Sequence, residues 1–276
     1  MIRTAFIPDS GYRFVVADFS AIEARVIAWL AGEETTLEAF RDGKDLYCET
    51  ASRMFGVPVE KHGANSELRQ KGKIAVLACG YQGGIGALKA MGALRMGLTE
   101  SELQPLVDAW RAANPNIVQL WADINTATIE TVSIRQPTQV GPLTFSLESG
   151  ILFIQLPPGR RLACVKPRLG ENRFGGTSII YDGITTSRKW GTLETYGGKL
   201  TENIVQAIAR DLLVYAMAKV ADAGNRIVMH VHDEIIVETT TGTVDEICAL
   251  MSQTPPWAKN LPLDADGYEC DFYMKD

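Results

Sequence analysis

The stretch Arg226-Ile-Val-Met-His-Val-His-Asp-Glu-Ile-Ile-Val-Glu238 decides the fold. Two apolar runs, 227–231 and 235–237, flank the polar residues His232, Asp233 and Glu234. Short β-branched runs are typical of buried strands, and a polar pair between two such runs predicts a tight hairpin. The hairpin would hold a carboxylate at the edge of a sheet, where it is costly unless paired, solvated or bound to a metal. A charged turn on an ordinary antiparallel pair explains this stretch equally well.

A second carboxylate stands in a similar setting near the N-terminus. Residues 13–18 form an apolar run that ends in Asp18. Ser20, a favoured helix cap, then precedes the helical spacing of apolar residues in 21–30. Asp18 is therefore expected at a strand end, as Asp233 is at a hairpin tip. Because about 200 residues separate the two, they can meet only in a sheet built from both ends of the chain.

Composition limits the functional classes. The 276 residues can bury a full core, and no run of 18 or more apolar residues or N-terminal leader is present, so we expect neither a membrane span nor secretion. Five scattered cysteines indicate reduced thiols in the cytosol and argue against a zinc site. The net charge of −6 argues against a general nucleic-acid binder, yet residues 151–200 carry an excess of bases that could follow a phosphate backbone. A solvated basic face is the simpler interpretation of that excess.

The segment 66–81 is the most informative predicted helix. Arg69, Lys73, Leu77 and Tyr81 recur every four residues, which places them in one stripe about 18 Å long. Residues on the opposite face are apolar and suit packing. A plain amphipathic surface would show the same spacing.

The remaining elements are predicted from caps and periodicity. Residues 99–113 open with a Thr99–Glu102 capping box, and a further helix covers 117–132. Residues 137–187 change to short strands and turns, 196–223 form a long helix that carries Gln206 and Asp211, and 268–274 resemble a strand.

Three of these stretches resemble the motifs of one family, in order and spacing. The segment Asp18-Phe-Ser-Ala-Ile-Glu-Ala-Arg25 resembles motif A of the family A (DNA polymerase I-like) DNA polymerases. The stripe from Arg69 to Tyr81 resembles motif B, and Val231-His-Asp-Glu234 resembles motif C. Gln206 and Asp211 match the Q-x-x-x-x-D of the helix before motif C, and the segment 190–213 looks most like phage or prophage members.

The resemblance implies an α+β fold, a polymerase palm with an antiparallel sheet and an inserted, largely helical fingers subdomain. Residues 1–32 and 192–276 would form the palm, and 33–191 the fingers with a β-rich insertion. Two Mg²⁺ ions would be held by Asp18, Asp233 and the carbonyl of Phe19, a donor set of hard oxygens that suits this cation. The catalytic residues implied are Asp18, Asp233 and Lys73; those that bind the nucleotide are Arg69, Lys73, Leu77, Tyr81, Glu23 and Tyr47; those that contact DNA are Gln206, His232 and Arg25.

The implied activity is template-directed transfer of a dNTP to a primer 3′-hydroxyl in the bacterial or phage-infected cytosol. The partners would be primer-template DNA and dNTPs, with an upstream polymerase fragment or processivity protein as a further candidate. The chain departs from the family in four respects, one of which is the turn after Tyr81, where Gln-Gly-Gly stands in place of a sequence that begins with Gly. Leu77 stands where Phe or Tyr is usual, Tyr47 replaces a His, and we expect the thumb and exonuclease-type domains to be absent. Two alternatives stay open: a DNA- or partner-binding remnant of a polymerase, and a metal phosphohydrolase that uses Asp18, His232, Asp233 and Glu234.

Overall fold

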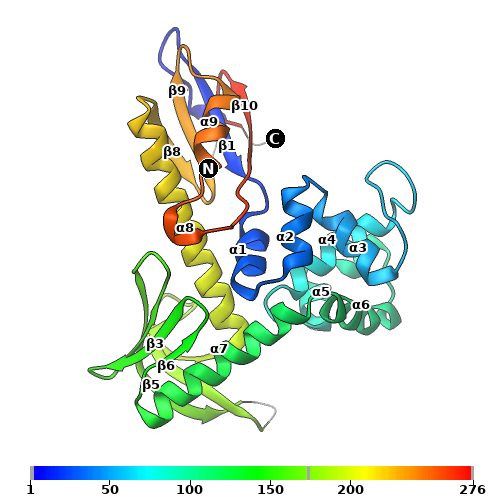
Figure 1. Ribbon diagram of the computed structural model, residues 1–276, viewed down its shortest axis with the longest axis vertical. Helices are drawn as coiled ribbons and strands as arrows, with labels where there is room; N and C mark the ends of the chain where they lie inside the picture. Colours follow the sequence, from blue (N-terminus) through cyan, green and yellow to red (C-terminus); the bar gives the residue numbers. More distant parts are fainter. Residues whose placement is uncertain (1–2, 173–174, 275–276) are drawn as a thin grey trace. The chain divides into compact units, whose positions relative to one another are not determined.

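The computed structural model describes residues 3–172 and 175–274, and the chain divides into two compact units (Figure 1). The first unit comprises Met1–Val26 and Gln206–Asp276, and the second comprises Ile27–Val205. The boundaries fall inside two helices, α1 (Ile22–Ala31) and α8 (Gly197–Asp222), rather than in loops. The assignment of the predicted ranges to palm and fingers stays a prediction. Arg173, part of the basic segment, lies outside the described residues.

An antiparallel sheet organises the first unit. Its described strands have the order β10-β1-β9-β8. Their bounds are Arg13–Phe19 (β1), Arg226–Val231 (β8), Glu234–Thr239 (β9) and Ala265–Cys270 (β10). β1 therefore lies between strands from the other end of the chain, which confirms the sheet built from both ends. The predicted α+β class with an antiparallel sheet is confirmed as well.

Both faces of this sheet are buried at its centre, since Val15, Val16 and Ala17 of β1 are all fully buried. One face carries Val16 and packs in a cluster with Phe14, Ile236 and Tyr273. The other face is covered by α9 (Val244–Met251), which lies against β1 and β10 (Figure 1). Burial of each of these aliphatic side chains contributes up to about 1.5–3 kcal/mol to the free energy of unfolding. The packed strands therefore form a stable sheet from which the hairpin extends.

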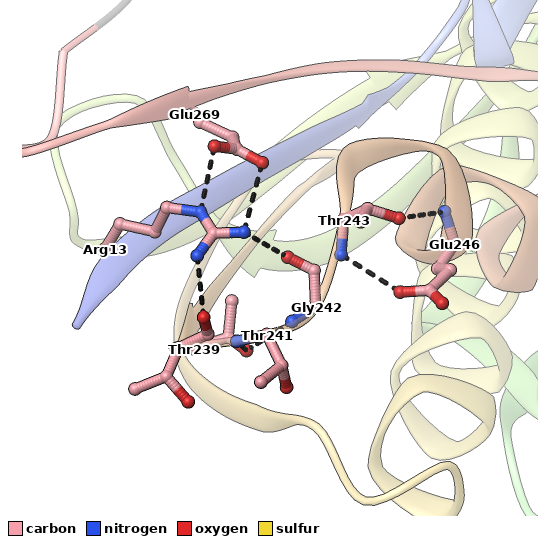
Figure 2. Close-up of polar contacts among 8 residues, drawn as sticks. Arg13, Thr239, Thr241, Gly242, Thr243, Glu246 and Glu269 are labelled. Atoms are coloured by element: carbon pink, nitrogen blue, oxygen red, sulfur yellow. Dashed lines mark hydrogen bonds and ion pairs between the residues drawn. The ribbon is translucent and has the colours of Figure 1, made fainter.

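A polar network fastens the end of the sheet away from the hairpin (Figure 2). Arg13 at the start of β1 pairs with Glu269 of β10, with Nε and Oε2 2.8 Å apart, and donates to the carbonyls of Thr240 and Gly242. Thr243 and Glu246 then form a capping box that begins α9. Because one guanidinium joins β1, β10 and the turn after β9, the strand ends are held in register here. Short 3₁₀ turns complete the unit at Arg3–Ala5 and Pro256–Ala258.

The second unit combines helices with a sheet. Its helices are α2 (Glu34–Arg41), α3 (Leu46–Phe55), α4 (Leu68–Cys79), α5 (Ile85–Ala90), α6 (Glu100–Ala113) and α7 (Pro115–Ile134), with a 3₁₀ turn at Ala93–Met96. The predicted Thr99–Glu102 capping box begins α6. Asn114 separates α6 from α7, Pro115 is the first residue of α7, and Trp110 stacks on Trp121 across the junction, with ring centroids 6.0 Å apart. Within the described ranges, no helix combines the length and apolar character that crossing a membrane requires.

The sheet of this unit is a meander in the order β2-β3-β4-β5-β6-β7. The strands are Thr138–Val140, Leu143–Glu148, Ile151–Gln155, Arg161–Glu171, Thr177–Ile184 and Trp190–Thr195. α7 packs along one face, over buried residues such as Phe145 and Ile154 (Figure 1). The β-rich character predicted for 137–187 is thus confirmed, and the turn-rich composition reflects the short connections of a meander.

Two local predictions were wrong. Ala21 rather than Ser20 precedes the first residue of α1, with a left-handed φ of 52°, and the Ser20 hydroxyl donates to Asp266 (2.8 Å). Tyr81 lies beyond the end of α4, because the helix ends at Cys79 and the chain turns through Gly80. The four-residue spacing therefore describes helix neighbours only as far as Leu77.

Candidate active site

The predicted catalytic carboxylates meet at one end of the sheet of the first unit. Asp18 is the residue directly opposite Glu234 in the antiparallel β1–β9 pair, and Asp233 immediately precedes Glu234 in the hairpin. The Phe19 N–H donates to the Asp233 carbonyl at 3.3 Å, so the ends of the two segments are hydrogen-bonded. Directly opposite residues have Cβ atoms about 4.5–5.5 Å apart. Asp18 and Asp233 are both half-buried, a position in which carboxylates can take ligands from solvent.

The hairpin turn itself is tight, as predicted, because Val231 pairs with Glu234 and only His232 and Asp233 connect the strands. His232 has a φ of 54°, in the left-handed region that non-glycine residues rarely adopt. Its side chain is exposed. Strained backbone conformations of this kind cluster at functional sites.

A third carboxylate of the hairpin is used inside the protein. Glu234 is 7% exposed and accepts a hydrogen bond from the hydroxyl of Tyr273, which is 2% exposed. The guanidinium carbon of Arg3 lies 5.1 Å from the centre of the Tyr273 ring, and the Tyr273 N–H donates to the Phe6 carbonyl (2.9 Å). Burial and the bond to Glu234 raise the pKa of Tyr273 to about 12. Segments near both termini therefore hold the carboxylate that faces Asp18.

Tyr273→Phe is expected to lower the free energy of unfolding by about 1–3 kcal/mol at pH 8, because it leaves the buried Glu234 carboxylate without this donor. The difference should shrink as the pH rises from about 10 to about 12. The reason is that the pKa of Tyr273 is higher in the folded protein than in the unfolded chain. The wild type therefore loses the stabilising effect of the hydroxyl as this group deprotonates, whereas Tyr273→Phe has no proton to lose. Denaturant unfolding of both proteins between pH 8 and 11.5 measures it, and a constant difference would contradict the assignment.

The segment that follows β1 is anchored from inside. Arg25 of α1 is 5% exposed; its Nε donates to the Ser20 carbonyl (2.7 Å) and its Nη1 to the Pro262 carbonyl (3.0 Å). Burial lowers the pKa of Arg25, an effect that Asp264 and Asp266 oppose. The structure thus shows Arg25 anchoring the segment that follows β1, and its predicted contact with DNA stays a prediction. Glu23 is half-buried on the first turn of the same helix.

The part of α8 that belongs to the first unit carries the other predicted DNA contact. Gln206 is exposed, and Asp211, five residues on, is half-buried. Buried Leu212, Leu213 and Ala216 fix the inner side of the helix. Arg210 lies against His230 of β8, with Nη1 and Nδ1 3.2 Å apart.

A basic cluster on α4 forms the second predicted group, within the second unit. Lys73 and Arg69 both lie over the ring of Tyr47, with Nζ and Cζ 5.8 and 5.2 Å from its centre. Arg69 also binds Asp45 through Nη2 (2.8 Å) and Nε (3.1 Å). Three residues assigned to the nucleotide by resemblance are thus brought together. The fourth member of this cluster, Asp45, was missed, although an Asp just before a helix is a sequence signal for a cap.

Asp45 links the cap of α3 to the cluster. Its Oδ1 accepts from the N–H groups of Tyr47 and Cys48 (3.0 and 2.9 Å) while the carboxylate binds Arg69. Partial burial alone would raise the pKa of Asp45, but the hydrogen bonds from Arg69 and Cys48 outweigh it and the pKa is lowered. The same contact raises the pKa of Arg69. The Asp45 carboxylate therefore holds the Arg69 guanidinium on the face of α4 from which Lys73 also extends.

The rest of the motif on α4 is set by close packing. Gly72 touches α3 so closely that a Cβ would lie 2.3 Å from the Tyr47 carbonyl oxygen. Ile74 and Ala78 are buried, as predicted, while Leu77 is 48% exposed. After the helix, the Gly80 carbonyl accepts from Trp121 Nε1 (3.1 Å), and the Gln82 side chain accepts from the Gly198 N–H (3.0 Å). The turn that carries Tyr81 is therefore tied to α7 and to the start of α8.

The donor set at the acidic end of the first unit fits a hard cation. The candidate ligands are carboxylates from Asp18 and Asp233 and the backbone carbonyl of Phe19, all oxygen atoms, as Mg²⁺ prefers. Over residues 3–172 and 175–274, no three or more His, Cys, Asp and Glu side chains gather into a group able to hold a metal. A two-carboxylate site completed by water and phosphate is consistent with that finding.

Comparison with known proteins shows which protein family the chain resembles. The model of DNA polymerase family A matches residues 1–138, half of the chain. A DNA polymerase of Bacillus phage SP02 is 55% identical over 280 residues, which cover 100% of this chain and 43% of the relative. A thermostable DNA polymerase I of Thermus thermophilus is 26% identical over 272 residues, 96% of this chain and 27% of that protein. The chain thus spans less than half the length of these relatives.

The fold agrees with this relationship. The POL domain of Pol1 from M. smegmatis, solved in complex with DNA primer-template and dNTP, matches with a TM-score of 0.64 over 98% of this chain and 42% of that chain. At 21% identity this likeness concerns the fold alone. Together with the motif residues gathered above, the family match leads to one conclusion: the chain belongs to DNA polymerase family A.

Proposed function

We propose that the chain is the catalytic part of a template-directed DNA polymerase, with primer-template DNA and dNTPs as substrates in the bacterial or phage-infected cytosol. The observation that carries the proposal is the register of β1 against β9, which puts Asp18 beside the Asp233 hairpin. Residues 1–32 and 192–276 form the palm in this proposal, and 33–191 the fingers with the inserted sheet. Family membership supports the use of a divalent metal.

The acidic end of the first unit is proposed to hold two Mg²⁺ ions through Asp18, Asp233 and the carbonyl of Phe19. Such a pair, when bound, activates the primer 3′-hydroxyl and neutralises the leaving pyrophosphate. The protein residues have separate tasks. The sheet holds the two carboxylates of Asp18 and Asp233 in place. The neighbouring carboxylate of Glu234 is not a proposed metal ligand, because it accepts a hydrogen bond from the Tyr273 hydroxyl inside the protein. His232 and Gln206, both exposed, are proposed to contact the primer-template. Arg25 acts by anchoring α1.

The basic cluster on α4 is proposed to bind the triphosphate. Arg69 and Lys73 present two cations on one helix face, and a planar guanidinium matches phosphate oxygens well. The ring of Tyr47 and the carboxylate of Asp45 hold the Arg69 guanidinium before any nucleotide arrives, which lowers the entropy lost on binding. Lys73 is proposed to give a proton to the leaving pyrophosphate, while Leu77 and Tyr81 lie along the base.

Primer extension separates this function from the two alternatives. A labelled hairpin primer-template is incubated with the chain, dNTPs and Mg²⁺, and products are resolved by length. Longer products support the polymerase. Binding without extension favours a DNA-binding remnant, and shorter products favour a phosphohydrolase.

Glu23→Ala tests the proposed exclusion of ribonucleotides. Glu23 lies five residues after Asp18 on the first turn of α1, and we propose that its side chain occupies the space that a ribose 2′-hydroxyl would need. The variant is expected to raise the ratio of rNTP to dNTP kcat/KM by roughly tenfold or more, because steric exclusion exceeds the effect of one methylene. If Glu23 only complements the helix dipole, the ratio will stay constant and the melting temperature alone will fall slightly. Glu23→Gln, which keeps the volume, is the matched control.

A further inference from the structure

The two hairpin turns at one end of the sheet in the second unit share an unusual charge. The turn sequences Leu156-Pro-Pro-Gly-Arg-Arg161 and Ile184-Thr-Thr-Ser-Arg-Lys-Trp190 contain four bases and no acid, in a chain whose net charge is −6. Neighbouring strands β5 and β6 are antiparallel, so the start of β5 and the end of β6 lie at the same end of the sheet. The four bases therefore belong to two turns at the same edge of the sheet.

An aromatic side chain stands among these cations. Trp190 is 64% exposed and pairs across the β6–β7 hairpin with Ile184, which is 70% exposed. Two residues further along each strand, on the same face of the hairpin, Asp182 pairs with Thr192, and both bind Arg168 (3.0 and 3.2 Å). The polar pair is thus satisfied within the sheet, whereas the apolar pair beyond it is left open to water. Contiguous exposed apolar surface marks contact sites on proteins, and this pair places two large exposed apolar side chains side by side.

The cations at this edge are available to a ligand in different degrees. Arg161 lies over the ring of Phe153, with Cζ 4.1 Å from the ring centre, and it pairs with Glu148 at 3.0 Å. Arg188 and Lys189, in the turn that leads to Trp190, are exposed. The β6–β7 turn thus offers two exposed positive charges directly before an exposed indole in the sequence.

We infer that this edge, made by residues 156–161 and 184–190, binds unpaired single-stranded DNA. Single-strand binding combines positive charges that follow the phosphates with aromatic rings on which bases stack. The faces of duplex bases are already stacked, so a duplex could use only the charges. The inference rests on the proposed function for its ligand, which would be the template strand that has not yet been copied.

Binding of a fluorescent 20-mer of oligo-dT in EDTA tests the inference without catalysis. Trp190→Ala is expected to weaken binding by at least about fivefold, and Trp190→Phe to restore most of it. A blunt duplex should bind the wild type and Trp190→Ala equally. The double variant Arg188→Glu/Lys189→Glu should weaken both the affinity and its dependence on salt.

Two matched controls come from the same unit. Ile134→Ala removes another exposed apolar side chain (61% exposed) at the end of α7. Arg135→Glu/Lys166→Glu reverses two exposed charges beside the β3–β4 turn, where the Lys166 N–H donates to the Gly150 carbonyl. Both controls should bind oligo-dT like the wild type. An equal loss in the charge control would show general electrostatics and overturn the inference, as would wild-type affinity of Trp190→Ala or no binding by the wild type.

Primer extension separates failure here from failure of the proposed function. With a long single-stranded template, Trp190→Ala should raise the KM for primer-template. With a template that ends at the copied base, it should match the wild type. A wild type that extends no primer defeats the proposed function, while the oligo-dT measurement still decides whether this edge binds single strands.

Discussion

Asp18→Asn and Asp233→Asn are each expected to reduce primer extension by about a thousandfold or more. Either change removes a charged ligand from the proposed metal site, where the metals supply several kcal/mol of transition-state stabilisation. Each 1.36 kcal/mol corresponds to a factor of ten in rate. Single-nucleotide incorporation at saturating dNTP, measured by rapid quench, gives the size of the loss.

The fold should survive both substitutions. Asp18 and the Asp233 hairpin lie at a strand end, and neighbouring carboxylates without a metal repel one another. We therefore expect melting temperatures in EDTA equal to or slightly above that of the wild type. Asp266→Asn is the matched control, because Asp266 is the partner of Asp18 on its other side, in β10, and binds Ser20. Extension near the wild-type rate in either of the first two variants would refute the proposed metal site.

Lys73→Ala is expected to lower kcat/KM for dNTPs by roughly 10²–10³-fold, with little change in DNA affinity. The expected size follows from the loss of one preorganised cation at a developing charge, together with a proton donor. Lys73 shares the ring of Tyr47 with Arg69, so both side chains start from one face of α4. Steady-state kinetics with a fixed primer-template measures the loss, and anisotropy measures the DNA affinity.

Lys71→Ala provides a closely matched comparison. Lys71 lies two residues earlier in the same helix, pairs with Glu102 of α6 at 2.9 Å, and lies near the ring of Phe55. Removing the Lys71 side chain changes the net charge of α4 by the same amount as removing Lys73, but it alters the opposite face of the helix. We expect less than about a threefold change in kcat/KM for this variant. If Lys73→Ala weakened DNA binding and left the KM for dNTP unchanged, the helix would have to face the duplex instead.

Much of the fold could be predicted because local signals agreed with tertiary packing. The runs around Asp18 and Asp233 have β-branched residues that the sheet buries, and Val231, Asp233 and Glu234 mark the hairpin at the observed positions. Periodicity fails at helix ends, where backbone geometry decides. Ser20 has the side chain of a cap, but its hydroxyl binds a carboxylate about 250 residues away in the sequence, which no local pattern reveals.

The same limit applies to the candidate site. The four-residue spacing predicted the face of α4 that carries Arg69 and Lys73. It could not show that Asp45 forms an ion pair with Arg69 or that Glu234 is buried against Tyr273. Both contacts join segments that are distant in sequence. The composition of residues 151–200 shows an excess of bases, but only the meander brings two turns of this basic segment to one edge of the sheet. Charge counts contain no information about which strands become neighbours.

The place of β1 between β10 and β9 has a consequence for synthesis on the ribosome. About 200 residues must be made after β1 before its partner β9 exists, which takes roughly 10–40 s at bacterial elongation rates of about 5–20 residues per second. Throughout that interval the nascent segment Arg13-Phe-Val-Val-Ala-Asp-Phe19 has neither of its two hydrogen-bonding edges covered. Such an apolar strand readily pairs with other chains. Nascent chains arrested before residue 226 should therefore bind chaperones that recognise extended apolar segments, and release should follow synthesis of the hairpin.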